Sequence, residues 1–150
     1  TPVPLATIAE SAAHNVADPV GGRKPEITLH VPKRLMVDVD AMQIEQVLAN
    51  LLRNAAEAMT QQKGAKITLT AREQDGFVDL HVIDNGPGIP PAKRDDVFRP
   101  FVSTKEQGTG LGLPICRKIV EEHGGSIEIG TSPLGGARFT IRLRPNLAKP

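Results

Sequence analysis

The chain has 150 residues, of which 39% are hydrophobic, which suits one compact domain with its own core and is too little for two. Its net charge of +1 and its lack of Trp and Tyr argue against a nucleic-acid-binding surface, because such surfaces need basic clusters and stacking aromatic side chains. No apolar run approaches the roughly 20 residues that span a bilayer, so we expect no direct membrane contact from this chain.

The first segment, residues 1–16, is predicted to be a short amphipathic helix, because Leu5, Ile8 and Ala12 recur at helical spacing. Proline and glycine pairs after it mark its end. We therefore predict three parts: an N-terminal helix that packs on the domain edge (1–22), the main domain (23–145) and a frayed tail (146–150). Residues 26–31 and 35–37 are predicted strands, separated by a turn.

Residues 40–62 form the longest predicted helix, with Asp38 or Asp40 as its N-cap. One side of this helix is broadly apolar, and another side carries polar residues three or four apart: Gln43, Gln46, Asn50, Asn54 and Glu57. Asn is a mediocre helix former, so two of them in mid-helix need a reason. Two interpretations stay open: a solvated polar face, or amide oxygens offered to a hydrated Mg²⁺ that shares its ligand shell with substrate phosphates.

Residues 66–72 and 77–83 alternate between apolar and polar side chains and are predicted to form a hairpin. The loop DNGPGIP follows, at residues 84–90. Its first residue, Asp84, ends a mostly apolar strand, where an ionised carboxylate needs a partner. An adenine amino group would be such a partner, because a carboxylate only accepts hydrogen bonds. An Asx turn that caps the loop explains Asp84 equally well.

A second ligand motif comes after a short predicted helix at residues 91–97 and two phenylalanines, Phe98 and Phe101, which we interpret as a hydrophobic latch rather than a stacking platform. Three alternating glycines then precede a helix that runs to Glu122. They allow backbone N–H groups to converge on a phosphate at the helix N-terminus. A dinucleotide-binding loop competes with this interpretation, but it needs a strand directly before the glycines, and here a polar segment with Lys105 precedes them.

The chain closes with two predicted strands, at residues 126–130 and 138–143, around the turn LGG. His123 ends the preceding helix, where it faces the helix dipole. The single cysteine, Cys116, excludes an internal disulfide and is interpreted as a packing residue.

Four segments in this order, NLLRNAAEAM, DNGPGIP, FRPFVSTK and GTGLGLPICRKIVEEHGG, resemble the N, G1, F and G2 boxes of the catalytic ATP-binding domain of bacterial sensor histidine kinases. The resemblance covers about residues 26–144, and the short segment from Lys105 to Gly108 is most similar to the nitrogen- and oxygen-sensing kinases. It implies the Bergerat-type ATP-binding fold shared with DNA gyrase and the MutL repair proteins. That fold is an α/β two-layer sandwich, in which a mixed, mostly antiparallel sheet packs against helices.

The same resemblance implies the cofactors ATP and Mg²⁺, with Asn54 as the metal ligand and Asn50 and Lys105 as the catalytic residues. Asp84 matches the adenine-binding aspartate. The residues implied to bind the cofactor are Asn54, Asp84, Gly86, Gly88, Ile89, Phe101, Lys105, Gly108, Thr109, Gly110, Leu111 and Gly112. Two positions depart from the family pattern: Glu57 stands where long-lid kinases often have Lys, and Ala137 stands where the last box often has Thr or Ser.

Asn50 also bears on the reaction. ATP-hydrolysing relatives carry a Glu at this place, one helical turn before the metal asparagine, and an amide is no base. The resemblance therefore implies transfer of the γ-phosphoryl group to a histidine rather than rapid hydrolysis. His14 matches the acceptor motif only weakly, because Asn15 takes its acidic place.

We thus expect two partners: a histidine-bearing dimerisation domain of the same parent kinase, and a response regulator receiver domain. The expected location is the cytoplasm, whether or not the parent protein has a membrane anchor. Two alternatives stay open, a hydrolytic ATP-driven clamp of the gyrase type and a nucleotide-sensing module without catalysis, the second because of Glu57 and Ala137.

Overall fold

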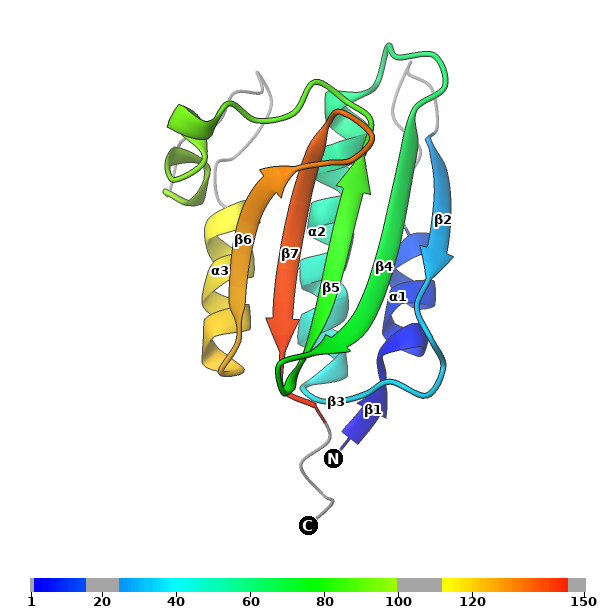
Figure 1. The fold of residues 1–150 in the computed structure, drawn as a ribbon, viewed down its shortest axis with the longest axis vertical. Coiled ribbons are helices and arrows are strands. Elements are labelled where there is room, and N and C mark those ends of the chain that lie inside the picture. The colour runs from blue at the N-terminus through cyan, green and yellow to red at the C-terminus, as the bar shows by residue number, and fades with distance from the viewer. Residues whose placement is uncertain (1, 16–24, 100–111, 146–150) are drawn as a thin grey trace.

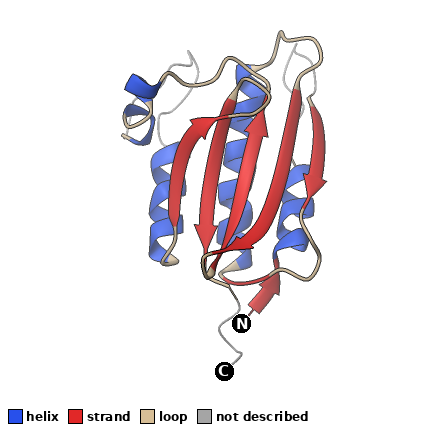
Figure 2. Ribbon diagram, in the orientation of Figure 1, coloured by secondary structure: helices blue, strands red, loops and turns tan. Residues whose placement is uncertain are grey.

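The computed structural model describes residues 2–15, 25–99 and 112–145, which form two layers (Figure 1). One layer is a five-stranded sheet with the strand order β2-β4-β5-β7-β6. The helices α1, α2 and α3 lie together on one face of this sheet (Figure 2). The α/β two-layer sandwich predicted from the sequence is therefore confirmed.

The strands of the main sheet are β2 (Glu26–His30), β4 (Lys66–Gln74), β5 (Phe77–Asp84), β6 (Ser126–Thr131) and β7 (Ala137–Leu143). β2 runs parallel to β4, and the other pairs are antiparallel, so the sheet is mixed and mostly antiparallel as predicted. The predicted hairpin of β4 and β5 is also confirmed. Asp75 and Gly76 in its turn have φ angles of 54° and 80°, which suit a two-residue type I′ turn.

The core lies between the sheet and the helices α1 (Leu5–His14), α2 (Ala41–Ala58) and α3 (Gly112–Glu122). Every second residue of the central strands faces the helices and is buried, as expected for strands with period-two alternation. The apolar face predicted for α2 is buried as well: Ile44, Val47, Leu48, Leu51, Leu52, Ala55 and Ala56. Asp40 is its N-cap, since Asp40 Oδ1 accepts from the backbone N–H of Gln43 at 3.1 Å.

The N-terminal segment differs from the prediction. The helix begins at Leu5 rather than at residue 1, and Pro2–Pro4 forms a short strand, β1, that pairs antiparallel with β3 (Met36–Asp38). Proline has a φ angle that suits an edge strand and no N–H to donate, which explains the extended start. α1 packs against α2 and its Leu5 and Ala9 are fully buried. The separation of residues 1–22 from the main domain stays a prediction.

Residues 91–97 also differ from the prediction, because they form two 3₁₀ turns, η1 (Pro91–Lys93) and η2 (Asp96–Phe98), in place of one short helix. Prolines at 90 and 91 remove two N–H donors, and so short a segment does not repay the cost of nucleating an α-helix. The predicted frayed tail lies outside the described residues. Among the helices that the structure describes, none is both long and apolar enough to cross a bilayer.

Candidate functional site

Three elements that carry predicted site residues meet at one end of the molecule. β5 and α2 end there, with Asp84 as the last residue of β5, and α3 begins with Gly112 on the same half of the molecule, beside the C-terminal half of α2 (Figure 1). Two contacts set α3 antiparallel to α2: the backbone N–H of Asp40 donates to His123 Nε2 at 3.1 Å, and Cys116 Sγ donates to the carbonyl of Val47 at 3.8 Å. Because both helices rise 1.5 Å per residue, Gly112 comes level with about residue 51 of α2.

Asp84 is buried, with 7% of its surface exposed, at the end of β5. Its Oδ1 accepts from the backbone N–H of Gly86 at 2.9 Å and from that of Ala137 at 3.1 Å. The first bond forms the Asx turn that the sequence analysis left open, and the second joins β5 to the start of β7. Within the part of the chain that the structure describes, the hydrogen bonds to this carboxylate all end on Oδ1.

The glycines around Asp84 shape its loop. A Cβ on Gly136 would lie 2.1 Å from Asp84 Oδ1, so only glycine fits at this position. A Cβ on Gly86 would lie 2.9 Å from Cγ of Met59, at the end of α2, and Gly88 has a φ angle of +76°. Ile89, next in the loop, is half-buried against the core. The loop geometry is therefore determined by contacts within the protein itself.

Asn85 anchors this loop to the connection between α2 and β4, a role that the sequence analysis missed. Its Oδ1 accepts from the backbone N–H of Lys66 at 2.8 Å and from Gln62 Nε2 at 3.2 Å, and its Nδ2 donates to the carbonyl of Gly64 at 2.9 Å. Asn side chains often hydrogen-bond to nearby backbone groups, so the residue type of Asn85 was the available clue. Its partners lie some 20 residues earlier in the chain, and nothing in the sequence pattern identified them.

Asn50 and Asn54 lie one helical turn apart on α2, and both are half-buried. The Arg53 guanidinium donates to Asn50 Oδ1. Asn50 also reaches the thiol of Cys116 on α3. Burial raises the pKa of Cys116 to about 11, although the hydrogen bond from Asn50 opposes this rise, so the thiol stays protonated near pH 7. Cys116 is thus a packing residue, as predicted, and Asn50 faces α3.

The segment after the Asp84 loop contacts that loop, the end of β6 and the helix α3. Arg94 Nε donates to the carbonyl of Ile89 at 3.0 Å, and its Nη2 donates to Oγ1 of Thr131, at the end of β6, at 3.0 Å. The Arg117 guanidinium of α3 lies 5.2 Å from the centre of the Phe98 ring. Phe98 packs against the core, but Phe101, its partner in the predicted hydrophobic latch, lies outside the described residues, so the latch stays a prediction.

Six of the predicted site residues lie outside the described part of the chain, so their roles stay predictions. They are Phe101, Lys105, Gly108, Thr109, Gly110 and Leu111. Of the described site residues, the structure brings Asp84, Gly86, Gly88 and Ile89 together in one loop, with Asn50, Asn54 and Gly112 on the two helices beside it.

Residues 39–147 match the family model described as histidine kinase-, DNA gyrase B-, and HSP90-like ATPase. The chain belongs to this ATPase family. The C4-dicarboxylate transport sensor protein DctB of Rhizobium meliloti is 37% identical to this ATPase domain over 144 residues, which cover 95% of the chain and 23% of DctB. The sensory histidine kinase/phosphatase NtrB of Vibrio alginolyticus is 40% identical over 124 residues, covering 75% of the chain and 34% of NtrB.

The fold of this ATPase domain is likewise that of histidine kinase catalytic domains. The solved catalytic domain of the histidine kinase ThkA is similar, with a TM-score of 0.83 and 33% identity over 96% of this chain and 94% of that domain. The predicted resemblance to histidine kinase catalytic domains that use ATP is confirmed, and the hydrolytic clamp is not favoured. The chain spans about a quarter to a third of the length of the two curated relatives named above.

Proposed function

We propose that this ATPase domain binds Mg²⁺·ATP beside the ends of α2, α3 and β5 and transfers the γ-phosphoryl group to a histidine on a separate dimerisation domain of the same parent kinase. One observation carries the proposal. Asp84 is a buried carboxylate whose Oδ1 accepts two backbone N–H groups, while Oδ2 keeps its capacity to accept from an adenine amino group.

The other predicted site residues take roles in keeping with their chemistry. Asn54 is the proposed Mg²⁺ ligand, because a neutral amide oxygen suits an ion that shares its shell with phosphates. Magnesium, when bound, would neutralise phosphate charge. Lys105 is the proposed cation for the γ-phosphate. The remaining proposed ATP contacts are Gly86, Gly88, Ile89, Phe101, Gly108, Thr109, Gly110, Leu111 and Gly112.

Asn50 favours transfer over hydrolysis. An amide does not take a proton from water, and its oxygen already accepts from Arg53. Phosphoryl transfer depends mainly on positioning and charge neutralisation, and a neutral imidazole brings its own lone pair at pH 7. The acceptor histidine therefore needs no base from this domain.

The proposed partners follow from the relatives, which are named as a sensor protein and a sensory histidine kinase/phosphatase. They are the histidine-bearing dimerisation domain and a response regulator receiver domain, and the proposed location is the cytoplasm.

The test of nucleotide binding uses Asp84→Asn. This substitution keeps Oδ1 for the two backbone bonds and replaces the acceptor at Oδ2 with an NH₂ donor, which would face the adenine amino group. We expect the ATP affinity by calorimetry to fall about 10- to 100-fold, as for loss of a hydrogen bond to a charged group. The matched control is Asp95→Asn, an exposed carboxylate after η1. Equal ATP affinity for both variants would rule out the proposed adenine contact.

The test of transfer adds a histidine-bearing partner domain and γ-labelled ATP. We expect label on the partner with the wild-type chain, and little with Asn54→Ala, whose ATP affinity should also lose its dependence on Mg²⁺. Steady phosphate release without the partner would instead support the clamp. Binding without transfer would support the nucleotide-sensing module.

A further inference from the structure

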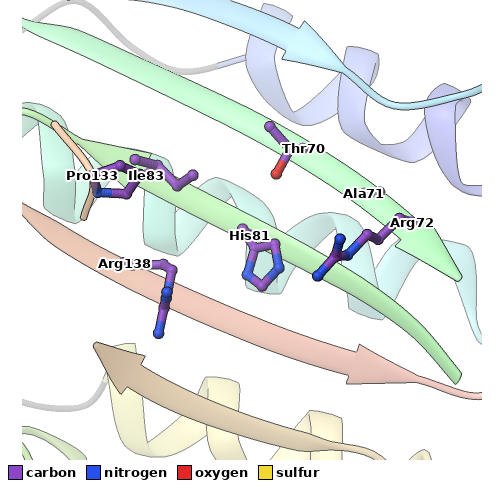
Figure 3. A pocket seen from close by; sticks show the side chains of 7 residues that line it. All are labelled: Thr70, Ala71, Arg72, His81, Ile83, Pro133 and Arg138. Carbon is purple, nitrogen blue, oxygen red and sulfur yellow. The ribbon is translucent and has the colours of Figure 1, made fainter. Parts of the chain in front are cut away.

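The face of the sheet that carries no helix has a cavity of about 290 Å³. Thr70 and Arg72 on β4 and His81 and Ile83 on β5 line it, with Pro133 and Arg138 on the side of β7 (Figure 3). These strand residues alternate with the buried ones that face the helices, so their side chains lie on the outer face. Asp84 faces the helix side, so the cavity is separate from the proposed nucleotide site.

Two arginines at this cavity have no acidic partner in the described ranges of the chain. Arg142, further along β7, is bound by Asp79 through two bonds of 2.9 and 3.1 Å. No described carboxylate pairs in this way with Arg72 or Arg138, and Nε of Arg138 is buried without an acceptor. A buried N–H without an acceptor is costly, so Arg138 is not fully paired within the described part of the chain. Its side chain is half-buried, and the accessible part remains available to a carboxylate from outside.

The side chains that line the cavity between the two arginines, His81 among them, are uncharged near pH 7. Burial lowers the pKa of His81, and the charges of Arg138 and Arg72 lower it further. Together these effects outweigh that of Asp79, which raises it. His81 Nδ1 lies 2.8 Å from Oγ1 of Thr140 on β7. The cavity therefore has positive charge at its two ends and uncharged, partly apolar side chains between them.

The two guanidinium groups are held apart. On β5, Arg72 lies opposite Asp79 and Arg138 lies opposite Ile83, so their Cα atoms are four residues apart along the sheet and two strands apart across it. Strand spacings put that separation at roughly 17 Å. A Cβ on Gly130 of β6 would lie 2.5 Å from Nη2 of Arg138, so this guanidinium lies over β6, away from Arg72. One phosphate does not fit both groups, but an extended chain does.

We propose that the outer face of the sheet docks an extended acidic segment of a partner protein, with carboxylates at positions i and i+4 that pair with Arg72 and Arg138. Side chains two residues apart along an extended segment share one face, so an apolar residue at i+2 would enter the cavity against Ile83 and Pro133. Charge complementarity selects the carboxylates. Four extended residues span about 13 Å, and the flexible glutamate and arginine side chains cover the remaining distance between the two arginine positions.

The test titrates the isotope-labelled 150-residue chain with a capped peptide that contains Glu-Thr-Val-Thr-Glu, at low ionic strength and followed by NMR. We expect saturable shifts in β4, β5 and β7 and at least fivefold weaker binding of the amide counterpart Gln-Thr-Val-Thr-Gln. Arg72→Gln and Arg138→Gln should each weaken binding of the acidic peptide about fivefold, the upper range for exposed ion pairs. Arg34→Gln, an equal charge change in an exposed turn, is the control and should bind as the wild type does.

Several outcomes would overturn the proposal: no saturable shifts, equal binding of both peptides, or an equal loss of affinity in the Arg34→Gln control. Displacement of the peptide by inorganic phosphate, with the same amides shifted, would identify a site for a small oxyanion instead. Arg138→Lys keeps the charge and serves as a second variant if Arg138→Gln fails to fold. ATP binding at the Asp84 site is measured in the same samples, so the two proposals fail independently.

Discussion

Gly136 is under a tighter steric constraint than its place in a surface turn indicates. Its Cα lies so close to Asp84 that a Cβ would overlap Oδ1 of that carboxylate and come within 2.6 Å of its backbone oxygen. The next residue, Ala137, serves Asp84 through its backbone N–H. The contact between β7 and Asp84 therefore needs no hydroxyl at position 137, where the family pattern often has Thr or Ser.

The first prediction concerns Gly136→Ala. The added methyl group forces the β6–β7 turn away from Asp84, so the free energy of unfolding should fall by about 1–3 kcal/mol, as for other overpacked sites. Urea denaturation measures this change. Gly112→Ala is the matched control, because a Cβ there meets nothing within 4 Å among the described residues and alanine favours the helix. A shared denaturation midpoint for Gly136→Ala and the wild type would contradict the proposed overlap.

How far single residues could be predicted depended on where their partners lie in the chain. Asp84 was found because a carboxylate at the end of an apolar strand needs a partner wherever the strand goes. The constraint on Gly136 was not found, since it comes from a residue 52 positions earlier that only the pairing of β5 with β7 brings near. Local chemistry thus reveals that a residue is unusual, and the sheet register reveals why.

At the scale of elements, α2 is held at both ends. Asp40 caps its first turn through Oδ1, and the backbone N–H of Asp40 donates to His123 Nε2. His123 Nδ1 in turn lies 2.8 Å from the carbonyl of Ile119, which assigns the proton to Nδ1 in a neutral ring. At the other end, Met59 lies against Gly86 in the Asp84 loop. The helix that carries Asn50 and Asn54 is thereby fixed relative to α3 and β5.

The second prediction tests the N-cap. Asp40→Ala removes the acceptor for the N–H of Gln43 and should lower the free energy of unfolding by about 1 kcal/mol, whereas Asp40→Asn keeps an acceptor and should cost only a few tenths. Both variants lose the same charge, so their difference isolates the cap. Thermal or urea denaturation gives the comparison. Equal stability of the two variants would show that the bond to Gln43 contributes nothing.

Elements with strong periodicity were predicted within a few residues, as for α2 and the β4–β5 hairpin. The short β1 was missed, because Pro2–Pro4 has no pattern of its own and becomes a strand only by pairing with β3, more than 30 residues later. The 3₁₀ turns η1 and η2 were predicted as one helix because apolar spacing alone does not separate helix types in a segment this short.

At the scale of the whole molecule, the two faces of the sheet differ in the polar and charged side chains that they carry. The buried strand residues on the helix side are apolar apart from Asp84, while the outer side holds polar pairs across β5 and β7, Asp79 with Arg142 and His81 with Thr140. Asp79 is only 4% exposed although no helix covers it, since its neighbours on the sheet shield it. The outer face is thus ordered by its own side-chain pairs, and its partly desolvated groups couple the stability of the fold to pH.

The third prediction follows from His81 and concerns this pH dependence. Burial lowers the pKa of His81 in the folded protein below its ordinary value of 6.5, so below that pH the unfolded chain takes up a proton that the folded chain resists. The free energy of unfolding should therefore fall as the pH decreases from 7.5 to 5, and this fall should be smaller in His81→Gln. His30→Gln, on the exposed edge strand β2, is the control for loss of one histidine. Urea denaturation at several pH values measures the slopes. If His81→Gln keeps the full wild-type pH dependence, burial of His81 does not contribute to it. The conclusion that His81 is uncharged in the outer cavity then loses its support.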